Sequence, residues 1–207
     1  MPWTTPETFT SGQTLTAASM NIVSGNANAG HPLVSTLPVS PADGDTIYYQ
    51  TAGMATDGIM WTLRYRAAGG TYKWECVGGT PWLEGDTGST QETTTSTSYA
   101  TTTNAPALTV PLAGDYRIAY DLEMGYVVGG PGNANSYATV KLGSAAASDD
   151  NCVVMHQPSS SLYVHVGRTI ERTLTASSEV KQFYKAPAGT TLGVLRRSLS
   201  VIPVRVG

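Results

Sequence analysis

The segment at residues 115–126 alternates regularly between polar and large apolar side chains. One side of the pattern holds Tyr116, Ile118, Tyr120, Leu122, Met124 and Tyr126, and the other holds Asp115, Arg117, Asp121 and Glu123. Successive side chains of a β-strand point to opposite faces of the sheet, so a period of two residues is the period of a strand. The pattern predicts a long strand with one buried face and one solvated face.

Shorter runs of the same kind fill the rest of the C-terminal part of the chain. The Thr- and Ser-rich residues 90–104 are predicted to form an edge strand rather than a disordered stalk, because β-branched Thr favours strands. Further strands, each separated from the next by Gly, Pro, Ser or Asn, are expected at residues 137–142, 152–156, 162–166, 169–175, 180–184, 191–196 and 199–206. Short strands at this spacing predict a jelly-roll-like β-sandwich over residues 84–207.

A second patterned stretch, residues 59–79, is rich in aromatic side chains. The alternating apolar positions are Ile59, Trp61, Leu63 and Tyr65 in its first half and Tyr72, Trp74 and Cys76 in its second half. Residues 67–70, Ala-Ala-Gly-Gly, let the chain reverse between the halves, since Gly tolerates positive φ. With a short strand at residues 47–50, this hairpin predicts a small aromatic β-meander over residues 46–83. We interpret it as a rigid coupling in which Trp61 and Trp74 are packing residues.

Residues 1–45 carry little charge and read as a loop-like attachment segment. Thr14 or Thr16 can cap a short helix that ends near Gly25, and residues 30–45 form a Pro-rich linker. A helix of two to three turns is not stable alone, so its apolar side needs a surface on another subunit, a partner or the chain's own β-module. The apolar side chains expected to make this attachment or oligomer contact are Trp3, Phe9, Leu15, Met20 and Ile22.

Charge and hydropathy limit the partners of the chain. Charged residues make up 13% of it and its formal net charge is −3, whereas a nucleic-acid binder needs a concentration of Lys and Arg. The first residues, MPWTTPETFT, lack the basic and apolar regions of a secretory signal. No apolar run approaches the roughly 20 residues of a membrane span. We therefore expect no nucleic acid, no membrane insertion, and folding and assembly in a cytoplasm.

Candidate metal ligands and disulfides are few. Cys76 and Cys152 are expected to be buried small hydrophobes, with a disulfide between them as the minor alternative. His156 and His165 could face each other across a hairpin, or meet at the axis of a trimer, but no carboxylate stands at ligand spacing near either one. The sequence therefore predicts no metal site.

Carboxylate pairs are the remaining candidates for catalysis, because glycan-cleaving enzymes need two carboxyl groups at a set separation. Asp121 and Glu123 are expected on a solvated strand face, and Asp149 and Asp150 in a turn. No nucleophile, metal or phosphate-binding motif accompanies them. We expect no catalytic residue, no cofactor and no enzyme activity.

Aromatic residues near loops are better candidates for binding. Tyr137 and Tyr163 stand beside loops, where a rigid amphipathic ring can stack on a sugar or contact a protein. Asn133 and Asn135 lie in the flexible segment VVGGPGNAN that precedes Tyr137. These four residues form the predicted receptor-binding set, with core packing as the alternative for the tyrosines.

Several motifs together resemble a known class of proteins. They are the opening WxxPxxFTSGQTLTAASMN, the central LPVSPADGDTIYYQ, GIMWTLRYR and YKWECVGG, and the terminal RRSLSVIPVRVG. In this combination the chain resembles small virion proteins of tailed bacteriophages, and most of all minor tail or fibre proteins of phages that infect actinobacteria. The resemblance implies an N-terminal attachment region, a small β-module and an outward-facing C-terminal sandwich, commonly in a homotrimer. It also implies assembly in the bacterial host and a location on the virion surface.

Three functions follow from these observations. The first is a structural virion protein whose C-terminal domain binds a host-surface glycan. Because long fibre repeats are absent, the alternative is a head-decoration or fibre protein that coats or reinforces the capsid without a receptor role. The third is a hydrolytic tail component, for which Asp121, Glu123, Asp149 and Asp150 would be the residues to mutate.

Overall fold

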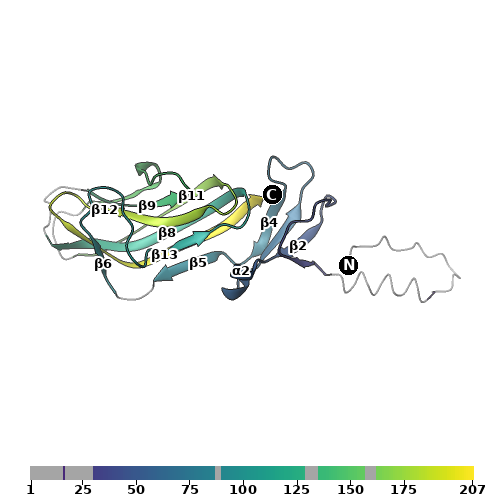
Figure 1. Ribbon diagram of the computed structural model, residues 1–207, viewed down its shortest axis with the longest axis horizontal. Helices are drawn as coiled ribbons and strands as arrows, with labels where there is room; N and C mark the ends of the chain where they lie inside the picture. Colours follow the sequence, from purple (N-terminus) through teal and green to yellow (C-terminus); the bar gives the residue numbers. More distant parts are fainter. Residues whose placement is uncertain (1–15, 17–29, 87–89, 129–134, 157–161) are drawn as a thin grey trace.

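A computed structural model describes residues 16, 30–86, 90–128, 135–156 and 162–207. These residues form an elongated, mainly β molecule with a sandwich at one end and a small module at the other (Figure 1). The expected N-terminal helix lies outside the described residues, as do the predicted attachment residues Trp3, Phe9, Leu15, Met20 and Ile22 and the predicted binding residue Asn133. No described helix has the length and hydropathy needed to cross a membrane.

The strands belong to two sheets. A short α-helix connects β2 to β3, and a 3-10 helix lies between β9 and β10 in the chain. In chain order the elements are β1 (Leu33–Val34), β2 (Thr46–Tyr49), α2 (Ala52–Thr56), β3 (Trp61–Tyr65), β4 (Trp74–Gly79), β5 (Trp82–Asp86), β6 (Glu92–Thr94), β7 (Ala107–Thr109), β8 (Gly114–Val128), β9 (Asn135–Leu142), η1 (Asp149–Asn151), β10 (Val153–His156), β11 (Val164–Leu174), β12 (Glu179–Lys185) and β13 (Thr191–Val206).

The sandwich has the strand order of a jelly roll. Its first sheet runs β6-β13-β8-β11 and its second runs β7-β12-β9-β10, with every neighbouring pair antiparallel. This is the arrangement of eight strands that two interlocked Greek keys produce. β5 extends the edge made by β6, because it pairs with a later stretch of β13. The predicted jelly-roll-like sandwich is confirmed.

The core between the sheets is built on the alternating side chains of β8. Tyr116, Ile118, Tyr120, Leu122, Met124 and Tyr126 are each at most 2% exposed. The second sheet covers them with the buried side chains of Ala138, Val140, Val180 and Tyr184. Burying each large apolar side chain contributes roughly 1.5–3 kcal/mol, so this strand is the main element of the core.

The small module is the predicted meander, and its sheet continues into the sandwich. β2, β3 and β4 pair in antiparallel order, and β4 pairs with the end of β13. Trp61 is fully buried, with its ring centroid 6.2 Å from that of Tyr49 and 6.4 Å from that of Tyr116 in the sandwich. Trp74 is 3% exposed. Both tryptophans are therefore packing residues, as predicted.

Several local predictions are wrong. Between the predicted strand at residues 47–50 and the hairpin at residues 59–79, where no element is expected, the chain forms α2, whose N-cap Thr51 accepts a hydrogen bond from the backbone of Met54. The predicted linker at residues 30–45 contains β1, which pairs in parallel with β2. The edge strand predicted in the Thr-rich segment exists but is shorter, since it covers Glu92–Thr94 alone, and this β6 pairs with β13. These elements are two to five residues long, too short to produce a recognisable period.

Two pairs of predicted strands are single strands. β11 continues through Gly167, where a Cβ would lie 3.0 Å from the backbone oxygen of Tyr120, so a Gly serves close approach rather than a turn. β13 continues through a bulge at residues 196–197, where Arg196 has a φ of 41°.

Cys76 and Cys152 are half-buried free thiols, which contradicts both full burial and a disulfide between them.

Candidate functional site

The outer face of the second sheet carries a regular array of aromatic and basic side chains. In the register of β9 and β12, Tyr137 lies opposite Lys185, Thr139 opposite Phe183, and Lys141 opposite Lys181. The intervening residues of β12, Val180, Gln182 and Tyr184, are fully buried in the sandwich. Side chains of paired residues project to the same face, so the aromatic rings and amines of the array stand together on the outside.

A cleft of about 520 Å³ lies over this array. Its walls come from three parts of the chain, the segment before β7, the connection from β9 to η1, and the strands β9 and β12. The lining residues are Thr97, Ser98, Tyr99, Lys141, Ala146, Ala147, Phe183 and Lys185. We call this space the aromatic cleft. Aromatic faces with a few convergent polar groups are the usual composition of a small-ligand site.

Lys185 links the two tyrosines at one end of the aromatic cleft. Its Nζ lies 4.1 Å from the ring centroid of Tyr137 and 4.6 Å from that of Tyr99, close enough for cation–π attraction. The same Nζ lies 2.9 Å from Asp149 Oδ1, which also accepts a 2.5 Å hydrogen bond from the Tyr99 hydroxyl. These contacts fix the orientation of both rings and of the carboxylate.

The same contacts set the protonation states of Tyr99 and Asp149. Burial raises the pKa of Tyr99, and its hydrogen bond to Asp149 raises it further. Hydrogen bonds from Tyr99 and Lys185 lower the pKa of Asp149. At neutral pH the phenol is therefore protonated and the carboxylate ionised. Such a group can donate to and accept from a polyhydroxylated ligand without changing its charge.

The structure brings some predicted binding residues together and separates another. Tyr137 stands beside the aromatic cleft. Asn135 precedes it by two residues on the same face of β9, with Oδ1 2.9 Å from His156 Nδ1. Tyr163 lies over the outer face of the first sheet, because a Cβ on Gly193 would come within 2.5 Å of its hydroxyl and one on Gly125 within 3.2 Å of its ring. Asn135 and Tyr137 thus share a surface from which Tyr163 is excluded.

Sequence reasoning missed most residues of the aromatic cleft. Tyr99 stands in the Thr-rich segment that was predicted to be an edge strand, and Asp149 in a turn. A signal was present in β12, where Lys181, Phe183 and Lys185 alternate with buried residues. That pattern indicates an outer face with a ring between two amines.

The two candidate carboxylate pairs are apart, since Asp121 and Glu123 lie on β8 of the first sheet and Asp149 and Asp150 lie in η1. Asp121 accepts a 2.6 Å hydrogen bond from Ser198 Oγ and lies 3.3 Å from His165 Nε2. The carboxylate thus stands between the hydroxyl and the imidazole, whereas activation of a Ser nucleophile requires the imidazole in the middle. Glu123 pairs with Arg196 at 2.7 Å.

The two candidate metal-binding histidines, His156 and His165, are also apart. His165 lies on the outer face of the first sheet beside Asp121, while His156 lies on the second sheet beside Asn135. Within the described ranges, no three His, Cys, Asp or Glu side chains converge on one point.

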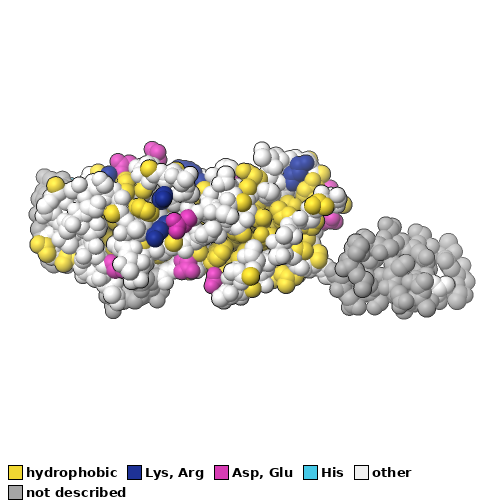
Figure 2. Space-filling view, viewed as in Figure 1, with side chains coloured by type: hydrophobic (Ala, Val, Ile, Leu, Met, Phe, Trp, Pro, Cys, Tyr) yellow, Lys and Arg dark blue, Asp and Glu magenta, His cyan; other side chains and the backbone are white. Residues whose placement is uncertain are grey.

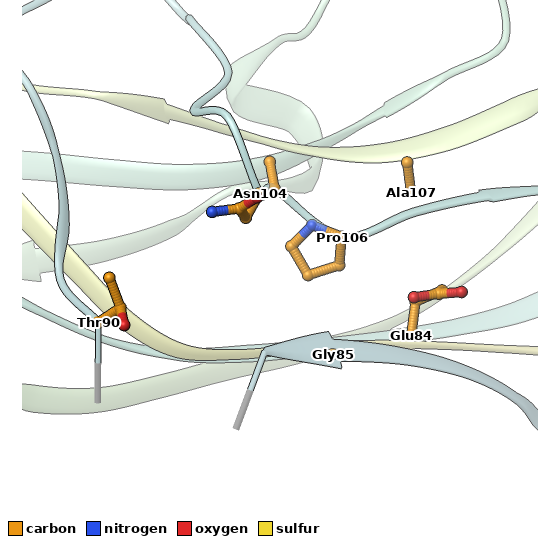
Figure 3. A pocket seen from close by; sticks show the side chains of 7 residues that line it. Glu84, Gly85, Thr90, Asn104, Pro106 and Ala107 are labelled. Carbon is orange, nitrogen blue, oxygen red and sulfur yellow. The ribbon is translucent and has the colours of Figure 1, made fainter. Parts of the chain in front are cut away.

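A second cleft, of about 570 Å³, lies between β5 and the segment before β7 (Figure 3). Its described lining residues are Glu84, Gly85, Thr90, Asn104, Ala105, Pro106 and Ala107. Asn104 is already engaged, since its side-chain amide donates a 2.8 Å hydrogen bond to Glu92. This described lining has neither an aromatic ring nor a basic group, so the aromatic cleft is the better candidate for a ligand site.

Comparison with protein-family models and with curated protein sequences finds no match. Among solved structures, the C-terminal domain of EclA, described as a sugar-binding protein, has a TM-score of 0.35 and 9% identity over 56% of this chain and 80% of that chain. An exo-β-1,3-galactanase from Phanerochaete chrysosporium has a TM-score of 0.28 and 13% identity over 68% of this chain and 33% of that chain. An isomalto-dextranase from Arthrobacter globiformis T6 has a TM-score of 0.26 and 15% identity over 77% of this chain and 24% of that chain. None of these overlaps assigns the chain to a family.

Proposed function

We propose that this protein is a structural protein of a bacteriophage virion, and that its C-terminal jelly roll binds a glycan on the host surface. The aromatic cleft is the observation that carries the proposal. A sugar ring can place its C–H face on Phe183 or Tyr99, while its hydroxyl groups exchange hydrogen bonds with Asp149 and Lys185. No catalytic step is assigned to the site.

The position of the aromatic cleft supports outward display. Tyr137 lies near the start of β9 and Lys185 ends β12, next to the connection that leads to the first residue of β13. The other end of β13 pairs with β4 of the small module. The end of β12, with Lys185, therefore lies toward the end of the sandwich that points away from the small module (Figure 1). The aromatic cleft extends from there toward the middle of the sheet, where Phe183 lies opposite Thr139.

Apolar exposure supports attachment through the small module and the residues before it. Leu33, Val39, Met60 and Val77 are 61%, 100%, 36% and 44% exposed. Figure 2 shows hydrophobic side chains gathered over the small module and its junction with the sandwich. Apolar groups concentrated in this way mark surfaces that contact another protein. In this proposal that protein is a tail or capsid component of the particle.

A second candidate function rests on the far end of the first sheet. Val127, Val128, Leu162 and Val164 are 42%, 63%, 65% and 41% exposed, and they stand on the paired strands β8 and β11 or just before β11. Aliphatic side chains there would pack between copies in a homotrimer or against neighbours on a capsid. This surface favours a decoration protein that coats or reinforces the particle.

Cell labelling separates the two functions. This protein, labelled with a fluorescent dye and incubated with a panel of actinobacterial cells, should bind to the cells of a susceptible host. Soluble polysaccharide from that host should compete with the cells for the labelled protein. A phage that lacks the protein should then adsorb poorly. Absence of labelling together with unchanged adsorption would reject host binding, and a copy number that follows capsid symmetry would support decoration.

A further inference from the structure

Lysine is rare in this chain and is concentrated beside the aromatic cleft. The sequence contains four lysines, Lys73, Lys141, Lys181 and Lys185, in a protein of net charge −3. The last three lie on the outer face of β9 and β12. Asp149 pairs with Lys185 and Glu179 lies on the same face, so the three lysines and these two carboxylates leave a local net charge of +1. This charge is opposite in sign to that of the whole molecule and favours anions.

Lys141 and Lys181 are directly opposite each other in the register of the two strands. Like charges at such positions destabilise a sheet, because their Cβ atoms are only about 4.5–5.5 Å apart. Lys185 is neutralised by Asp149, but in the described part of the chain neither Lys141 nor Lys181 forms an ion pair. Glu179, which lies on the same face of β12, forms none with them either. An anion bound between the two amines would offset their repulsion.

The amine pair and the aromatic cleft are continuous. Lys141 lines the cleft, and its Nζ lies 5.9 Å from the ring centroid of Phe183. A sugar stacked on Phe183 would therefore hold a substituent within reach of Lys141 and, across the strand pair, of Lys181. Such a substituent can be a charged group on the sugar itself or on the next residue of the polymer.

We infer that the glycan bound in the aromatic cleft is acidic, with a carboxylate or phosphate group held by Lys141 and Lys181. This inference rests on the proposed function and names the class of its ligand. Phe183 supplies the stacking surface, and the two amines supply the selectivity for an anionic over a neutral sugar. Lys185, already held by Asp149, positions the rings of Tyr99 and Tyr137.

Matched polymers test the inference on the full chain. The probes are polygalacturonate against its carboxyl-reduced form, and dextran phosphate against dextran, which separates carboxylate from phosphate as the source of the charge. The variants are K141Q, K181Q and their double variant, with K73Q as a control that removes the same charge from the exposed lysine before β4. Thermal unfolding of each variant verifies that it is folded.

We expect the acidic polymer of at least one pair to bind at least about tenfold more tightly than its neutral form, because charge-assisted hydrogen bonds are stronger than neutral ones. K141Q and K181Q should each weaken acidic binding about three- to tenfold, whereas K73Q should not. Binding should fall as NaCl rises from about 0.05 to 0.5 M. F183A should weaken both acidic and neutral binding.

The outcomes that overturn the inference are distinct from those that overturn glycan binding. Equal affinity for acidic and neutral polymers, lost in F183A but retained in K141Q/K181Q, would reject the acidic ligand and leave glycan binding intact. Acidic binding that is unchanged in F183A would show simple attraction of polyanions and would also reject the inference. If the native chain binds neither these polymers nor polysaccharide from the cells that it labels, both the acidic ligand and glycan binding are rejected.

Discussion

Arg197 and Glu92 form an ion pair inside the sandwich, although 105 residues separate them in the sequence. The Arg197 side chain is fully buried and that of Glu92 is 13% exposed. Arg197 also donates a 2.9 Å hydrogen bond to Thr102 Oγ1, and the backbone and side chain of Asn104 donate to the Glu92 carboxylate. The pair therefore joins β13, β6 and the segment before β7, where the two sheets of the jelly roll meet.

Replacing Arg197 by Met should lower the free energy of unfolding by about 3–5 kcal/mol, because it leaves the Glu92 carboxylate in a largely buried site without its counter-charge. Urea denaturation followed by tryptophan fluorescence measures the change. The double variant E92Q/R197M should be more stable than R197M, since it removes the stranded charge. A loss below about 1 kcal/mol in R197M would show that the pair contributes little.

The stability of the fold should depend on acid through Glu92. Burial raises the pKa of this carboxyl, but hydrogen bonds from Thr102, Arg197 and Asn104 outweigh it, so the net shift is downward. A carboxyl with a lower pKa in the folded state adds stability above its unfolded pKa, about 4.3, and loses it as the pH falls toward the folded pKa. The urea concentration at which half of the protein is unfolded should therefore decrease when the pH is lowered below about 4.

The variant E92Q isolates this contribution from those of other carboxylates. Glu75 and Asp149 also have lowered pKa values and remain in both proteins. The difference in unfolding free energy between native protein and E92Q should shrink as the pH falls from 6 to 3. A difference that stays constant over this range would assign the acid sensitivity to other groups.

Replacing Trp61 by Ala should uncouple the small module from the sandwich. Its indole packs between Tyr49 of β2 and Tyr116 of β8, so its loss opens a cavity at the junction. The expected cost is about 3–5 kcal/mol by differential scanning calorimetry. The neighbouring variant M60A is the control, because Met60 is 36% exposed and should change stability by less than about 0.5 kcal/mol. Equal effects of the two variants would contradict the coupling role.

Much of the fold could be predicted from the sequence because its strands are long enough to show a period. The alternation of β8 and of β3 with β4 identifies their buried faces directly. The aromatic cleft could not be predicted this way, because Tyr99 and Asp149 are 50 residues apart and meet only through the jelly-roll topology. The burial of Arg197 could not be predicted either, because a bulge after Leu195 changes the alternation of β13 and turns this charged residue into the core.

The binding of host polysaccharide by F183A and Y163A tests the central claim most directly. Phe183 lines the aromatic cleft, whereas Tyr163 lies over the first sheet, on the opposite face of the sandwich. Titration of each folded variant with polysaccharide from a labelled host should show at least about a tenfold loss of affinity in F183A and native affinity in Y163A. Native affinity in F183A, or loss confined to Y163A, would contradict the assignment of glycan binding to the aromatic cleft.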